Sequence, residues 1–235
     1  MTDCDPHSRT RVLLGDEAIT TLRSSSVAVF GLGGVGSYVA ETLCRSGVGS
    51  LTLVDADVVS VSNLNRQLCA LHSTIGLHKT DAMAARLRDI NPSCLLELRN
   101  TFYAEAVSEE MPLDGFDYVV DAIDTVSSKV LLIRMAHESN IPIISCMGTG
   151  NRVDPMGFTV SDLSQTTGCP LARAVRRALR TVNIEHVKVV WSKELPMKRG
   201  TNGKQVLGSL PFVPPAAGLL IASEVVRDLT TGRTP

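Results

Sequence analysis

Residues 27–67 read VAVFGLGGVGSYVAETLCRSGVGSLTLVDADVVSVSNLNRQ, and this stretch decides the fold. It begins with an apolar strand over 27–30 and continues into a helix over 36–45. The turn between them carries glycines at the spacing of a mononucleotide-binding unit: Gly31, Gly33 and Gly36. A second apolar strand ends at Asp55, where a carboxylate can accept hydrogen bonds from both ribose hydroxyls. The stretch therefore predicts a Rossmann-like α/β fold that binds a nucleotide.

Charged and amide side chains follow Asp55 at the edge of the sheet where open α/β folds bind ligands. They are Asn63, Asn65, Arg66 and Gln67. Lys79 starts a patterned helix, and Asp121 and Asp124 end another apolar strand. A reacting triphosphate needs a guanidinium, an ammonium and a carboxylate that can hold Mg²⁺. Hydride transfer needs none of these, so a nicotinamide or flavin enzyme becomes the weaker interpretation of the glycines.

This combination resembles the adenylating enzymes of the E1-like superfamily, which include activators of sulfur-carrier proteins. The matching segments fall within residues 9–150 and read GLGGVG, VDADVVSVSNLNRQ, GLHK, INP and DAID. By this resemblance, Asp55 would hold the ribose, Asn63, Arg66 and Lys79 the phosphates, and Asp124 the Mg²⁺. The implied nucleotide site comprises Gly31, Gly33, Gly34, Gly36, Asp55, Asp57, Asn63, Arg66, Gln67, Lys79, Asp121 and Asp124. As structural alternatives, Asp124 would cap a helix and Lys79 would be a solvated first-turn residue.

The composition favours one domain over residues 1–235, although the length allows one or two. We expect an N-terminal arm over 1–24, a nucleotide-binding core over 25–150 and a basic part over 151–235. No segment has the length of an apolar membrane span, and the first ten residues do not resemble a signal peptide. The six cysteines form no C-x-x-C pair, which argues against zinc and disulfides and predicts a cytoplasmic protein.

Alternating apolar strands and patterned helices predict a mostly parallel sheet covered on both faces. The expected strands cover 27–30, 51–54, 94–98, 117–121, 141–146, 158–161 and 186–191. The expected helices cover 10–23, 36–45, 79–90, 104–110, 127–139, 170–181 and 215–229. We expect a polar loop over 196–209.

Positive charge is concentrated in one part of the chain. Residues 173–204 contain nine lysines and arginines against two glutamates, whereas the remainder is net acidic. Four arginines recur at helical spacing and predict a guanidinium stripe: Arg173, Arg176, Arg177 and Arg180. The following loop adds Lys198, Arg199 and Lys204. A nucleic-acid backbone and a solvated helix face explain this pattern equally well.

The basic part makes the chain similar to the branch of the superfamily that dehydrates threonylcarbamoyladenosine in tRNA. The segments RTRVLLGDEAITTL, CPLARAVRRALR and GSLPFVPPAAGLLIASEVVRDL carry this resemblance, more loosely after residue 150. It implies ATP- and Mg²⁺-dependent dehydration of N6-threonylcarbamoyladenosine at position 37 of tRNA through an acyl-adenylate. Cys169 departs from the acidic residue of the branch, so no role is carried over to it. A nucleophilic thiol and a small apolar helix cap are the two readings of Cys169, and we favour the cap.

The resemblance also implies a homodimer in which Arg11, or alternatively Arg9, reaches the partner's ATP. The resemblance does not decide whether a sulfur-relay protein is also a partner. Three rival functions are an activator of a ubiquitin-like sulfur-carrier protein, an NAD-dependent oxidoreductase, and a tRNA-binding module with a vestigial nucleotide pocket. The missing zinc cysteines and the basic stripe argue against the activator. The polar residues after Asp55 argue against the other two.

Overall fold

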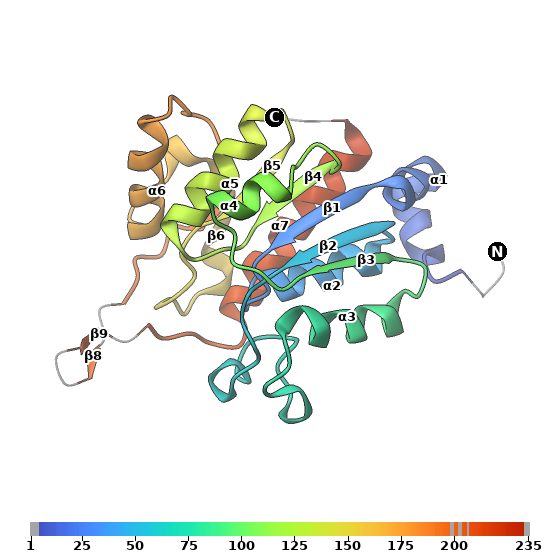
Figure 1. The fold of residues 1–235 in the computed structure, drawn as a ribbon, viewed down its shortest axis with the longest axis horizontal. Helices are drawn as coiled ribbons and strands as arrows, with labels where there is room; N and C mark the ends of the chain where they lie inside the picture. Colours follow the sequence, from blue (N-terminus) through green and yellow to red (C-terminus); the bar gives the residue numbers. More distant parts are fainter. Residues whose placement is uncertain (1–4, 198–199, 202–203, 206, 233–235) are drawn as a thin grey trace.

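A seven-stranded sheet forms the centre of the computed structural model, which describes residues 5–197, 200–201, 204–205 and 207–232. Its strands are β1 (Ser26–Phe30), β2 (Ser50–Val54), β3 (Leu95–Arg99), β4 (Tyr118–Asp121), β5 (Ile143–Cys146), β6 (Phe158–Asp162) and β7 (Lys188–Ser192). They lie in the order β3–β2–β1–β4–β5–β7–β6 (Figure 1). All neighbours are parallel except β6 and β7, which are antiparallel. The mostly parallel α/β fold is therefore confirmed.

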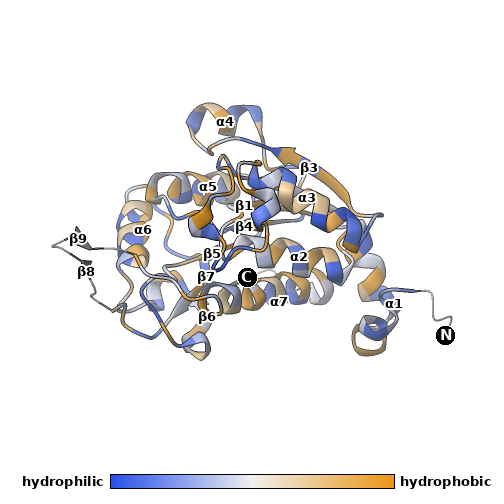
Figure 2. Ribbon diagram, turned by 90° about the horizontal axis from the view of Figure 1, so that it is seen from below, coloured by the Kyte–Doolittle hydropathy of each residue, from blue (hydrophilic) through white to orange (hydrophobic). Residues whose placement is uncertain are grey.

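Helices cover both faces of this sheet. They are α1 (Ser8–Ser24), α2 (Gly36–Ser46), α3 (Lys79–Ile90), α4 (Glu105–Glu110), α5 (Val126–Glu138), α6 (Pro170–Arg180) and α7 (Val213–Thr231). Figure 2 shows α2 and α7 on one side of the strands and α4 and α5 on the other. Side chains of a strand alternate between the two faces, so Val29 packs under α2 and α7, whereas Phe30 packs toward α5.

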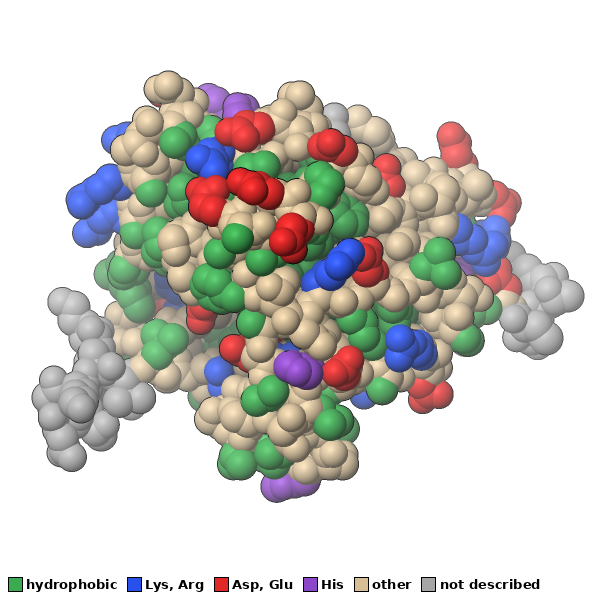
Figure 3. All heavy atoms as spheres, viewed as in Figure 1, with side chains coloured by type: hydrophobic (Ala, Val, Ile, Leu, Met, Phe, Trp, Pro, Cys, Tyr) green, Lys and Arg blue, Asp and Glu red, His purple; other side chains and the backbone are tan. Residues whose placement is uncertain are grey.

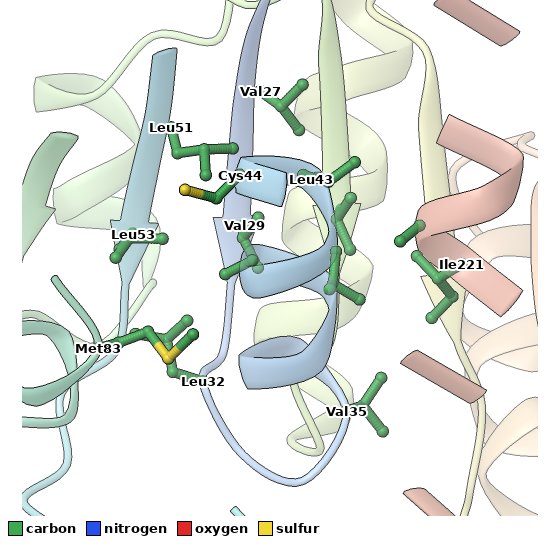
Figure 4. Packing of buried hydrophobic residues seen from close by; sticks show 14 of the residues in the cluster. Val27, Val29, Leu32, Val35, Leu43, Cys44, Leu51, Leu53, Met83 and Ile221 are labelled. Atoms are coloured by element: carbon green, nitrogen blue, oxygen red, sulfur yellow. The ribbon is translucent and has the colours of Figure 1, made fainter. Parts of the chain in front are cut away.

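The main core lies between β1, β2 and the helices α2, α3 and α7. Figure 4 shows Val29 beside Leu43 of α2, with Leu53 and Met83 on one side and Ile221 on the other. All five side chains are completely buried. Burying an aliphatic side chain of this size contributes about 1.5–3 kcal/mol, so this layer holds the glycine turn against the sheet.

The helix expected over 10–23, α1, is not continuous. Gly15 has a φ of 85° and breaks the helix in two. Ala18, Ile19 and Leu22 beyond the break are buried. Val12 and Leu13, before the break, are 66% and 84% exposed, because the chain changes direction at Gly15.

The remaining helix and strand boundaries agree with the sequence predictions within two residues. Short 3-10 turns at 61–63, 72–74, 155–157 and 163–165 were not expected. The predicted loop 196–209 contains an antiparallel pair, β8 (Gly200–Thr201) and β9 (Lys204–Gln205). No helix among the described residues combines the length and the apolar character needed to cross a lipid bilayer.

Candidate active site

A cleft of about 970 Å³ opens at the carboxyl ends of β1, β2, β4 and β5. This volume suits a nucleotide. The cleft brings together ten of the twelve residues of the predicted nucleotide site: Gly31, Gly33, Gly34, Asp55, Asp57, Asn63, Arg66, Gln67, Lys79 and Asp124. They come from three segments, which follow β1, β2 and β4, and the parallel sheet gathers these segments at one edge.

Close backbone contacts hold the glycine turn. Gly31 has a φ of +89°, and a Cβ there would lie 2.7 Å from the carbonyl oxygen of Ala122. A Cβ on Gly36 would lie 1.8 Å from the carbonyl oxygen of Gly31. Gly36 therefore shapes the turn from behind and does not line the cleft. At Gly33 the nearest atom to a Cβ is 3.8 Å away, at Gln67, so this position has room for an approaching ligand.

Asp55 is anchored by the backbone at the end of β2. Its Oδ2 accepts a hydrogen bond from the Leu32 amide at 2.6 Å, and its Oδ1 accepts one from the Asp57 amide at 2.8 Å. These bonds fix the carboxylate beside the glycine turn. Each carboxylate oxygen has a further acceptor position, so the geometry permits a ribose hydroxyl as well.

Lys79 is buried rather than solvated, which contradicts the structural alternative for it. The residue is 5% exposed, and its Nζ lies 2.6 Å from Asp57 Oδ2 and 3.7 Å from Asp55 Oδ1. The Lys79 amide also donates to the Asp57 carbonyl at 3.0 Å. These contacts aim an ammonium group into the cleft, and burial strengthens its attraction for phosphate.

Segment 57–79, which projects below the sheet in Figure 1, is closed on itself by backbone pairing. The Val59 amide donates to the Leu77 carbonyl at 2.8 Å, and the Gly76 amide donates to the Val59 carbonyl at 2.9 Å. Inside this segment, Asn63 accepts from the Ser60 amide at 3.1 Å. The closed segment holds its polar side chains at the cleft.

The Arg66 guanidinium is held by neighbours in this segment. Its Nη1 donates to the Ser62 carbonyl at 2.9 Å and to Asn65 Oδ1 at 2.8 Å. Asn65 in turn donates to the Ser209 carbonyl at 3.0 Å. The contact with Ser209 ties the segment to the chain just before α7, so Arg66 is positioned from two distant parts of the sequence.

Asp121 does not reach the cleft, which corrects the sequence prediction. Its side chain is completely buried, accepts from Lys129 Nζ at 2.7 Å and accepts from Ser145 Oγ at 2.5 Å. Lys129 also donates to the Cys146 carbonyl at 2.9 Å. Asp121 is the last residue of β4, and its side chain points under α5 to form a buried ion pair. The sequence signal that we missed is the lone lysine, Lys129, directly before the apolar run VLLI of α5.

Asp124 stands exposed on the cleft wall, just before α5. The residue that caps this helix is Thr125, and no side chain makes a capping hydrogen bond. The alternative that Asp124 is a helix cap is therefore wrong. No group of three metal-ligating side chains occurs among the described residues. Mg²⁺ is commonly held by one or two carboxylates together with phosphate oxygens, so a single aspartate beside a nucleotide pocket fits this ion.

Arg152 lines the cleft and was missed by the sequence reasoning. It follows β5 and is 2% exposed, and its Nε donates to the Gly148 carbonyl at 2.9 Å. The available signal was its place after an apolar strand, at the edge where Asp55 and Asp124 also lie. A lone arginine in a glycine-rich loop carries no distinctive pattern.

Both cysteines near the cleft are buried. Cys169 is 3% exposed at the start of α6 and packs against Ala172 and the other apolar residues beneath that helix, as the cap reading predicts. Cys146 is also in the core, and burial raises the pKa of its thiol to about 12. A thiol with so high a pKa remains protonated at neutral pH and is a poor nucleophile.

The arginine stripe on α6 is interrupted, which corrects the prediction of a continuous guanidinium face. Arg176 turns inward, where its Nη1 donates to the Leu163 carbonyl at 2.9 Å and to the Thr166 carbonyl at 3.0 Å. Arg173, Arg177 and Arg180 are exposed. Figure 3 shows basic side chains gathered at the edge of the molecule over α6. Lys198 and Arg199, and the side chain of Lys204, lie outside the described residues.

Arg11 lies on α1, outside the cleft of its own chain. Its guanidinium pairs with Asp5 at 2.6 Å and with Asp16. Arg9, its alternative, is exposed on the same helix. The contact of either arginine with a partner's nucleotide stays a prediction.

Comparisons of sequence and of structure with known proteins point to the same family. Residues 7–235 match the ThiF family. The tRNA threonylcarbamoyladenosine dehydratase of Bacillus subtilis is 42% identical over 237 residues, covering 94% of this chain and 93% of that protein. The crystal structure of the Escherichia coli tRNA N6-threonylcarbamoyladenosine dehydratase TcdA in complex with ATP is 33% identical, with a TM-score of 0.89, covering 97% of this chain and 94% of that chain. The complex of TcdA with AMP has a TM-score of 0.88 at 33% identity, covering 95% and 93%.

Proposed function

Because the chain belongs to the ThiF family, we propose that it uses ATP to dehydrate N6-threonylcarbamoyladenosine at position 37 of tRNA. One observation carries this proposal: the chain matches dehydratases over nearly its whole length, including one that is seen with ATP. The polar cleft at the carboxyl edge of the sheet supports it independently. This chemistry activates a carboxylate by adenylation and then lets the same side chain close on its own activated carbonyl.

The residues of the cleft have separate roles in this proposal. Asp55 accepts the ribose hydroxyls, and the glycine turn lets the phosphates approach the backbone. Lys79, Arg66 and Asn63 bind the phosphates and stabilise the negative charge that grows there as pyrophosphate leaves. No enzyme nucleophile is needed, because the group that closes the ring is already part of the activated molecule.

Asp124 would hold Mg²⁺ together with phosphate oxygens in the cleft. The ion supplies Lewis-acid stabilisation of charge on the phosphates when it is bound. Asp124 is suited to this role because it is exposed to the cleft and forms no ion pair with a described residue.

On α6, we assign the exposed side chains of Arg173, Arg177 and Arg180 to the tRNA backbone, together with Lys198, Arg199 and Lys204 from the loop that follows. Arg176 is excluded from this set because its guanidinium is committed to Leu163 and Thr166. Guanidinium groups on one helix face displace counterions from phosphates and so bind RNA in a salt-dependent manner.

We further propose a cytoplasmic homodimer in which Arg11 reaches the ATP of the partner subunit. The five described cysteines are free thiols, as is usual in reducing compartments. A sulfur-relay protein remains a candidate partner of the same assembly.

The test measures pyrophosphate release from ATP in the presence of three substrates. These are tRNA carrying N6-threonylcarbamoyladenosine, the same tRNA without the modification, and a ubiquitin-like sulfur-carrier protein. We expect release only with the modified tRNA, accompanied by loss of one water mass from the nucleoside. Release stimulated only by the carrier protein would instead identify a carrier-activating enzyme.

A further inference from the structure

Arg152 is a buried cation without a counterion among the described residues. Its side chain is 2% exposed, and its one hydrogen bond to a described residue joins Nε to the Gly148 carbonyl at 2.9 Å. Nη1 is buried and finds no acceptor in the part of the chain that the structure describes. The other buried cations near the cleft each have a carboxylate partner. Lys79 pairs with Asp57, and Lys129 pairs with Asp121.

An isolated buried guanidinium is unfavourable, because the low-dielectric interior replaces its hydration without supplying a partner. Arg152 lines the cleft, so a ligand group in the cleft lies beside this residue. The guanidinium cannot lose its proton to escape this cost. These facts together indicate that an anionic ligand group completes the pairing of Arg152.

The sheet order places Arg152 away from the residues assigned to the nucleotide. Asp55 follows β2, Asp124 follows β4 and Arg152 follows β5 along the edge β2–β1–β4–β5. Neighbouring strands are about 4.8 Å apart, so β2 and β5 are separated by about 14 Å. Arg66 and Lys79 already supply positive charge on the β2 side, whereas Arg152 supplies it on the β5 side. The β5 side of the cleft thus offers a place for a second anion, beyond the ribose-phosphate assigned to the β2 side.

We propose that Arg152 binds the carboxylate of the threonylcarbamoyl group and positions it for attack on ATP. This inference rests on the proposed function. The planar guanidinium has two terminal nitrogens that match a carboxylate, and its Nε bond to Gly148 fixes the plane of the group. Arg152 thereby selects substrates that carry a negatively charged carboxylate.

The step that Arg152 serves is balanced without a proton transfer from the arginine. A carboxylate oxygen forms a bond to the α-phosphorus of ATP. The bond from that phosphorus to the bridging oxygen breaks, and pyrophosphate leaves with the electron pair. Arg152 stays protonated throughout, and it holds the second carboxylate oxygen while the first one attacks.

The experiment compares two RNA ligands that differ only in charge. They are an anticodon stem-loop carrying N6-threonylcarbamoyladenosine and the same stem-loop carrying its methyl ester, both bound in the presence of Mg²⁺ and α,β-methylene ATP. We expect the unaltered protein to bind the acid at least about tenfold more tightly than the ester, as loss of a charge-assisted bidentate contact predicts. Arg152→Gln should reduce this ratio to about one, and its affinity for α,β-methylene ATP alone should stay within about twofold.

Arg86→Gln is the matched control, because Arg86 pairs with Glu41 outside the cleft and its loss should leave the ratio unchanged. Arg152→Lys keeps the positive charge but lacks the paired terminal nitrogens of the guanidinium, so it should lower the ratio by a smaller factor. This variant replaces Arg152→Gln in the test if the Gln variant does not fold. An unchanged ratio in both Arg152 variants would overturn the proposal, and weaker ATP binding with an unchanged ratio would reassign Arg152 to a phosphate. If the unaltered protein releases no pyrophosphate with the acid stem-loop, the proposed function is wrong and this inference falls with it.

Discussion

On α1, at the amino edge of the sheet, Arg11 is paired within the chain, whereas at the carboxyl edge two charged groups are left for a ligand. On α1, Arg11 pairs with Asp5 and Asp16. In the cleft, Arg152 has no acceptor for Nη1 among the described residues, and Asp124 is exposed with no basic partner there. Charged residues alone therefore do not mark a site. The informative feature is a charge that the fold positions and does not neutralise.

The largest effect should follow from changing Asp124 at the carboxyl edge. Asp124→Asn is nearly isosteric, but an amide is a poor ligand for a hard cation. Metal stabilisation of several kcal/mol corresponds to a loss of roughly 1,000-fold in kcat. Pyrophosphate release at saturating Mg²⁺ measures this loss, and an unchanged thermal midpoint shows that the fold is intact. Near-normal turnover would remove Asp124 from the site.

If Arg11 binds the ATP of the partner subunit, its ion pairs with Asp5 and Asp16 must open in the dimer. A charged group at the amino edge would then also serve a ligand. Mixing Arg11→Ala with Asp124→Asn tests this, since each variant should be inactive alone. Subunit exchange should restore about a quarter to a half of the unaltered activity, because a mixed dimer contains one site that lacks neither residue. Native mass spectrometry verifies the mixed dimers. Absence of recovery in their presence would refute the assignment in trans.

Asp121 tests whether a paired carboxylate near the cleft is purely structural. Asp121→Asn or Lys129→Met alone leaves one buried charge unpaired and should lower the free energy of unfolding by about 3–5 kcal/mol. The double variant should recover part of this loss, because no unpaired charge remains. Urea unfolding of the three variants measures the coupling. Weaker ATP binding by Asp121→Asn with no loss of stability would return Asp121 to the nucleotide site.

The arginines of α6 also differ in whether their guanidinium groups are exposed or bonded within the chain. Changing Arg173, Arg177 and Arg180 together to Gln should weaken tRNA binding and reduce the slope of log K against log salt by roughly two to three, as three lost phosphate contacts predict. Arg176→Gln should leave that slope unchanged and lower stability by about 1–3 kcal/mol, because the Thr166 carbonyl loses this donor and the Leu163 carbonyl loses one of its donors. Filter binding of tRNA at several salt concentrations measures this slope for both variants. Equal slopes in the triple variant and the unaltered protein would identify a solvated face.

The smallest effect concerns His7, a buried group at the amino edge. Burial lowers the pKa of His7, and the nearby Arg23 guanidinium adds to this, with Asp5 opposing it. The unfolded chain therefore binds a proton that the folded chain refuses as pH falls below about 6.5, so stability is lost toward acid pH. Between pH 7.5 and 5.5, His7→Gln should lose less unfolding free energy than the unaltered protein, by about 1 kcal/mol or less. An equal loss in both proteins would show that His7 does not contribute.

Much of the fold and of the cleft could be predicted because the signals are local. Apolar runs and helical spacing gave the strands and helices within two residues, apart from the short turns and the break in α1. Ten residues of the predicted nucleotide site meet at one edge because parallel strands all end there. Gly15 could not be recognised as a helix break, because glycine is tolerated inside helices at a cost of only about 1 kcal/mol.

By itself the sequence determined the strands of the nucleotide-binding half, the glycine turn and the placement of Asp55, Lys79 and Asp124 at one edge. Only the tertiary structure decided which charges are neutralised. Asp121 meets Lys129 under α5, Arg176 meets carbonyls ten and thirteen residues before it, and Arg152 meets no carboxylate among the described residues. The physical reason is that the cost of a charge depends on its burial and its partners, and both are set by elements that are far apart in the chain.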